Sequence, residues 1–162
     1  MKWERAEKMF AHSGLSLTEG QFHQFSTYQE ILVETNRRMN LTTITEDAEV
    51  WRKHFLDSCL PFQYVEIPKG AAVIDVGTGA GFPGIPMRIL RPDLRLTMLD
   101  SLQKRVDFLR DCCNENLCKT AVKADKRVVK ASGNRRQNSA EAGVSHTVHG
   151  RGTGHEPFAG HS

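Results

Sequence analysis

The sequence predicts an α/β protein in which a helical N-terminal part precedes the opening half of an open, parallel sheet. Three observations predict this fold. Apolar residues recur at helical spacing up to about residue 59, two short apolar runs then follow, and a glycine-rich turn joins the first run to another helix. The 162 residues, 39% of them hydrophobic, fit one globular domain with a small appendage.

The N-terminal third is predicted to be helical. Thr18 and Gln21 have the spacing of a capping box, in which a hydroxyl residue precedes a glutamine by three positions. They open a long amphipathic segment, and a further apolar pattern is ended by Pro61. The expected helices are 3–11, about 19–38 and about 50–59, within a helical cap of residues 1–67.

The pattern changes after a turn signal at 68–70. Residues 73–76 suit a parallel strand covered on both faces, and 94–99 suit a second strand. A short helix that starts at two prolines lies between them. Ser101 is expected to cap a last helix in which the aligned apolar residues are Leu102, Val106, Leu109, Cys113 and Leu117, and 68–117 is expected to form the first half of the α/β domain.

The turn after the first strand carries a pattern typical of a ligand site. Three alternating glycines, Gly77, Gly79 and Gly81, follow Asp75, and a second acid, Asp100, ends the next strand. Glycine lets a ligand approach the backbone, and an acid at that place accepts hydrogen bonds from ribose hydroxyls. The pattern favours S-adenosylmethionine over NAD. The alternative is a tight strand–helix turn that binds no ligand.

These motifs closely resemble the RsmG/GidB family, the bacterial 16S ribosomal RNA guanine-N7 methyltransferases. The resemblance runs from about residue 17 to 117, and its motifs lie at 40–42, 54–58, 75–86, 91–93 and 99–110. It implies a Rossmann-like S-adenosylmethionine-dependent methyltransferase fold with a helical N-terminal cap. Because the family continues with more strand–helix units, the resemblance also implies that the fold is incomplete at the C-terminus.

The resemblance further implies roles for individual residues. Lys104 and Arg105 would face RNA phosphate or cofactor. Guanine N7 has no proton to remove, so methyl transfer needs alignment more than a base, and we expect neither a catalytic base nor a metal. The substrate would be 16S rRNA or the 30S subunit. The cofactor-binding residues would be Asp75, Gly77, Thr78, Gly79, Gly81, Phe82, Asp100 and Ser101.

Residues 118–162 differ from the rest of the chain. They hold 8 basic and 3 acidic residues and have no Leu, Ile, Met, Trp or Tyr. A basic, disordered tail is therefore expected there. The first strand would then have one partner, and a two-stranded sheet is marginally stable. The alternative function is a non-catalytic cofactor- or RNA-binding remnant of a truncated or frame-shifted enzyme.

Three further observations complete the predictions. His54 is either a functional residue or a packed histidine of the cap. The four cysteines lack zinc-ligand spacing, which favours structural thiols. No stretch reaches the ~20 apolar residues of a membrane span, and the first residues lack the apolar run of a secretory signal. We therefore expect a cytoplasmic protein with no membrane association.

Overall fold

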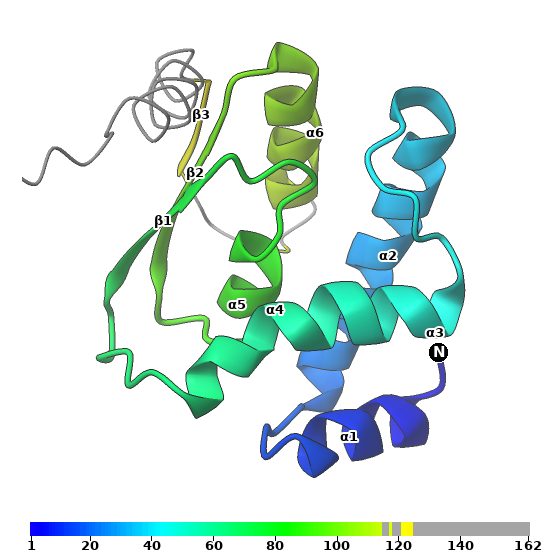
Figure 1. Ribbon diagram of the computed structural model, residues 1–162, viewed down its shortest axis with the longest axis vertical. Helices are drawn as coiled ribbons and strands as arrows, with labels where there is room; N and C mark the ends of the chain where they lie inside the picture. The colour runs from blue at the N-terminus through cyan, green and yellow to red at the C-terminus, as the bar shows by residue number, and fades with distance from the viewer. Residues whose placement is uncertain (115–116, 118–120, 125–162) are drawn as a thin grey trace, which may run out of the picture.

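The computed structural model describes residues 1–114, 117 and 121–124. Within them, a small parallel sheet lies beside a group of helices, and all these helices gather on one side of the sheet (Figure 1). Strands β1 (Ala72–Val76), β2 (Arg95–Asp100) and β3 (Ala121–Ala124) stand in the order β1-β2-β3. Because right-handed crossovers that add strands in one direction put their helices on one face, α5 (Gly84–Leu90) and α6 (Gln103–Asn114) share that face.

The predicted helices of the cap are confirmed. They are α1 (Trp3–His12) and α2 (Glu19–Met39), and the capping box is present. The Gln21 N–H donates to Thr18 Oγ1 at 3.2 Å, while Gln21 Oε1 accepts from the Thr18 N–H at 2.9 Å. The same glutamine also donates from Nε2 to the carbonyls of Ile89 and Leu90, at 3.2 and 3.0 Å.

The third predicted helix is present but irregular. It consists of α3 (Asp47–Glu49), the π-helix η1 (Val50–Leu56), α4 (Asp57–Cys59) and the 3₁₀ turn η2 (Leu60–Gln63) in direct succession. The α-helical part ends at Cys59, as predicted, and a 3₁₀ turn follows it. Pro61 lies in the first positions of η2, where a missing N–H leaves no hydrogen bond unmade.

The expectation of a two-stranded sheet was wrong. β3 pairs with β2 in parallel, with Thr97 opposite Ala121 and Asp100 opposite Ala124. Four residues with a lysine among them give no strong strand signal, but the free edge of β2 supplies their backbone hydrogen bonds. The remainder of the tail that we expected to be disordered, 125–162, lies outside the described residues.

β1 is not covered on both faces, as the sequence suggested. Ile74 is 64% exposed and Val76 is 58% exposed, whereas Asp75 between them is buried. The physical reason is that side chains alternate along a strand and that α5 and α6 cover only one face. On this strand Val73 and Asp75 therefore point inward, and Ile74 and Val76 point outward.

Two details of α6 also differ from the prediction. The helix begins at Gln103, so Ser101 lies too early to cap it, and Asp100 Oδ1 instead accepts from the Leu102 N–H at 2.9 Å. Leu102 is 43% exposed and Cys113 is half-buried. The face that packs inward is rotated from the expected one and consists of Val106, Phe108, Leu109 and Cys112.

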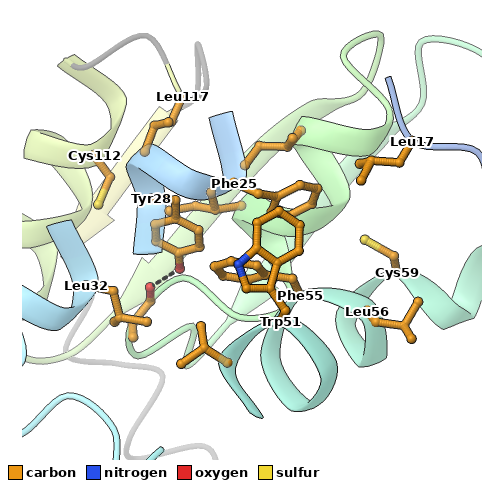
Figure 2. Packing of buried hydrophobic residues seen from close by; sticks show 14 of the residues in the cluster. Leu17, Phe25, Tyr28, Leu32, Trp51, Phe55, Leu56, Cys59, Cys112 and Leu117 are labelled. Atoms are coloured by element: carbon orange, nitrogen blue, oxygen red, sulfur yellow. Dashed lines mark hydrogen bonds between the residues drawn. The ribbon is translucent and has the colours of Figure 1, made fainter. Parts of the chain in front are cut away.

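The cap and the α/β part share one hydrophobic core. Its centre is an aromatic cluster that comes mainly from α2 and η1, and Figure 2 shows Phe25, Tyr28, Trp51 and Phe55 gathered there. The Phe25 and Phe55 ring centroids are 4.9 Å apart, within the range of favourable aromatic pairs. None of the helices in the described part of the chain is long and apolar enough to cross a membrane.

Candidate functional site

The glycine-rich turn lies between β1 and α5, at the carboxyl edge of the sheet. Gly77, Gly79 and Gly81 have φ values of +78°, +62° and +100°. Side chains make such conformations costly, by roughly 1–2 kcal/mol at each residue. The backbone path of the turn therefore requires glycine at all three positions. We call residues 77–83 the glycine loop, and this loop folds over the end of β2.

Asp75 ties the two ends of the glycine loop together. Its Oδ2 accepts from the Thr78 hydroxyl at 2.6 Å and from the Gly84 N–H at 3.0 Å. Burial raises the pKa of Asp75, these two bonds oppose the rise, and the neighbouring Asp100 adds to it. Because its acceptors are used within the turn, Asp75 maintains the shape of the loop. A Cβ at Gly84 would lie 2.8 Å from Oδ2, so the helix start can approach only as glycine.

Asp100 ends β2 directly beside the loop. Its Oδ2 accepts from the Gly79 N–H at 2.9 Å, and Arg105 Nη1 lies 3.6 Å from the same oxygen. With the bond from Oδ1 to Leu102, the carboxylate of Asp100 is 97% buried and contacts three separate groups. A carboxylate has about four acceptor positions, and the two backbone N–H groups use two of them.

The loop has an open side and a packed side. A Cβ built on Gly77 or Gly79 meets nothing within 4 Å, so a ligand can approach the backbone there. At Gly81 a Cβ would come within 2.6 Å of Ile85 Cδ1 and 2.8 Å of the Tyr28 hydroxyl. The first two glycines therefore leave space for a ligand, and the third makes room for packing.

The cap supplies the packed side. The Tyr28 hydroxyl donates to the Ala80 carbonyl, and Figure 2 shows this bond from the aromatic cluster. The Phe82 ring lies 5.6 Å from Tyr28 and is stacked on His54. Sequence reasoning placed Tyr28 only on the apolar face of α2. The signal that could have revealed its role is the phenol hydroxyl on this apolar face. A buried phenol requires a hydrogen-bond partner, so a polar contact was to be expected.

The structure thus brings most of the predicted site residues together at one edge of the sheet. Thr78 is buried and its hydroxyl is turned toward Asp75. Ser101 is half-buried next to Asp100. Lys104 is exposed in the first turn of α6, and Arg105 is beside Asp100. The two basic residues therefore lie on the rim of the site and outside the loop itself.

The cysteines described by the structure belong to the hydrophobic core or pack against it. Cys59 and Cys112 are buried, and burial raises the pKa of Cys59 to about 12. No group of three or more His, Cys, Asp or Glu side chains that could hold a metal ion occurs among the residues the structure describes.

A parallel sheet whose first strand enters a glycine-rich turn, with an acid at the end of the second strand, is typical of the methyltransferase-like class of α/β folds. Comparison with known families identifies the particular one. The family described as rRNA small subunit methyltransferase G (GidB) matches residues 21–141, and the chain belongs to this family. The match reaches well past residue 117, where the motifs indicated its end, and it includes β3.

Individual relatives agree with the family assignment. The chain is 52% identical over 104 residues to "Ribosomal RNA small subunit methyltransferase G" of Alkaliphilus metalliredigens. This alignment covers 63% of the present chain and 43% of the relative. It is 48% identical over 109 residues to the protein of the same name from Bacillus thuringiensis, which covers 67% of this chain and 46% of the relative. The chain therefore aligns with less than half the length of these relatives.

Proposed function

We propose that the protein is an S-adenosylmethionine-dependent methyltransferase that acts on N7 of a guanine in 16S rRNA. The observation that carries this proposal is the glycine loop, with Asp75 bonded to both of its ends and Asp100 beside it, in a chain of the methyltransferase G family. Its working partner would be 16S rRNA or the 30S subunit, in the cytoplasm. The names of the relatives support the substrate class.

The residues present fit S-adenosylmethionine. Gly77 and Gly79 leave the loop open, and Asp100 keeps an acceptor position for a ribose hydroxyl. When bound, the cofactor supplies an activated sulfonium methyl group. We assign cofactor contacts to these residues with Phe82 and Ser101. We assign to Asp75, Thr78 and Gly81 the maintenance of the loop's shape.

The remaining chemistry is a matter of position. Guanine N7 presents a lone pair, so no side chain has to remove a proton. The chain's task is to orient the guanine and to exclude water, and we assign to Lys104 and Arg105 contacts with RNA phosphates. Lys104 is exposed, and Arg105 is paired with Asp100. We propose that residues 1–67 act as a cap over the loop and that 68–117 hold the cofactor, with β3 (Ala121–Ala124) adding a strand to the same sheet.

The test combines binding and transfer. Calorimetry with S-adenosylmethionine should show binding by the wild type and at least tenfold weaker binding by Gly79→Val, which fills the open side of the loop. Purified 30S subunits from a strain without this modification should gain label from methyl-labelled cofactor. Binding by folded protein with no transfer to 30S or naked 16S rRNA would instead favour the cofactor-binding remnant.

A further inference from the structure

His54 lies outside the glycine loop but contacts it face to face. Its ring is stacked on Phe82 with the centroids 4.4 Å apart and the planes 11° from parallel. This separation is at the short end of the range for favourable aromatic pairs. Such a pair contributes stabilising free energy beyond that of the apolar area it buries. Phe82 follows Gly81 directly, so the imidazole presses on the last turn of the loop.

The other edge of the imidazole is held as well. His54 Nε2 lies 2.8 Å from Thr42 Oγ1, and the same oxygen accepts from the Ile44 N–H at 3.0 Å. The Thr42 N–H in turn donates to Asn36 Oδ1 at 2.8 Å. His54 therefore connects the segment that follows α2 with the loop, and its ring has little freedom to rotate.

The local helix geometry gives a second, independent observation. His54 lies in η1, a π-helix of seven residues. π-Helical turns are rare, and where they occur they are frequently at functional sites. In η1 the wider turn keeps Val50, Trp51 and Phe55 in the core while His54 faces Phe82. The same helix thus serves both the core and the loop.

Two contacts from the cap fall on either side of Gly81. The Tyr28 hydroxyl holds the Ala80 carbonyl before it, and His54 holds the Phe82 ring after it. Gly81 itself has φ +100°, and a glycine that its neighbours do not hold can adopt many other backbone conformations. Two fixed neighbours select one of them.

Resting on the proposed function, we propose that His54 is a positioning residue, which acts through Phe82 to hold the glycine loop in the shape that receives S-adenosylmethionine. It does not contact the cofactor. The sequence left two roles open for this histidine, a functional one and a packed one. In this proposal the stacking of His54 on Phe82 serves both roles. Removal of the ring should free residues 80–83 and weaken cofactor binding.

The experiment uses the full chain and S-adenosylhomocysteine as the probe. His54→Ala should weaken its binding about tenfold in calorimetry and should speed hydrogen exchange of residues 77–84 by a similar factor. His54→Phe keeps a stacking ring and should recover most of the affinity, whereas Thr42→Val should lose about threefold. His23→Ala is the matched control, because that exposed ring also contacts a phenylalanine, Phe22, but lies away from the loop.

The outcomes separate this inference from the function. If the wild type binds and His54→Ala binds equally well with only a lower melting temperature, the histidine is packing alone and the inference fails. If the wild type does not bind, the proposed function fails, and loop exchange alone decides the role of His54. Should His54→Ala not fold, His54→Phe and Thr42→Val decide: a change in loop exchange for Thr42→Val supports the inference, and none overturns it.

Discussion

The aromatic cluster of the cap and the outer face of β1 place apolar side chains in opposite environments. Phe10, Phe25 and Phe55 in the cluster are completely buried, whereas Ile74 and Val76 on β1 are more than half exposed. Both segments have the apolar composition of a protein interior. The difference teaches that an apolar run is buried only where another element covers it, and that β1 uses its covered face for the carboxylate of Asp75.

Removal of one cluster ring gives the largest expected effect. Phe55→Ala should lower the free energy of unfolding by about 3–5 kcal/mol, because the lost ring leaves a cavity among four aromatic neighbours. Ile74→Ala on the open face should cost about 0.5 kcal/mol or less. Urea denaturation checks both values. An equal loss at Ile74 would show that the outer face of β1 is covered in solution.

Within the glycine loop, the same contrast separates the packed side from the open side. Gly81→Ala should cost about 2–4 kcal/mol, because the new methyl group meets Ile85 and Tyr28 and the backbone is strained. Gly77→Ala adds strain alone, so it should cost about 1–2 kcal/mol. Thermal unfolding monitored by circular dichroism compares the two. Equal losses would contradict the assignment of the packed side to Gly81.

The inward carboxylate of β1 should matter more than an exposed one. Asp75→Ala leaves the Thr78 hydroxyl and the Gly84 N–H without their acceptor, at a cost of about 1–3 kcal/mol. Asp107→Ala removes only exposed contacts with Gln103 and Arg110 and should leave stability nearly unchanged. Denaturant titrations of both variants make the comparison. A stable Asp75→Ala protein would mean that the loop keeps its shape without this side chain.

The smallest expected effect is the pH dependence of stability that comes from His54, at the contact between cap and loop. Burial lowers the pKa of His54, and Asp57 opposes the shift. The unfolded chain, with an ordinary histidine pKa of about 6.5, then binds more protons than the folded chain just below that pH. The contribution of the neutral His54 side chain to stability is therefore complete above pH 6.5. It is lost as the pH falls toward the pKa of His54 in the folded protein. Melting temperatures between pH 7.5 and 5 should therefore fall more in the wild type than in His54→Phe, and parallel curves would contradict this.

The sequence was sufficient where a local rule fixes the structure. The capping box needs only Thr18 and Gln21, and the backbone path of the loop needs only its glycines and the strand before it. Asp75 and Asp100 meet because the ends of neighbouring parallel strands lie side by side. These features depend on chemistry within a few residues or on a topology that the pattern already implies.

Other features depend on partners that no local pattern contains. β3 forms because the edge of β2 is free, and the bond from Tyr28 to Ala80 joins positions 52 residues apart. The π-helix was not predicted either, because the apolar positions of 50–59 were matched only to the period of an α-helix. The part that the cap plays in the site was therefore found only in the structure.

The side chain of Gln21 has a consequence for how the molecule unfolds. Its oxygen belongs to the start of α2, and its nitrogen holds the last carbonyls of α5, which belongs to the sheet. A glutamate would complete the capping box equally well, but it would turn a negative charge toward two carbonyl oxygens. With one amide shared between the two helix ends, fraying at either end removes a bond from the other. The cap and the sheet are thereby linked into one cooperative unit.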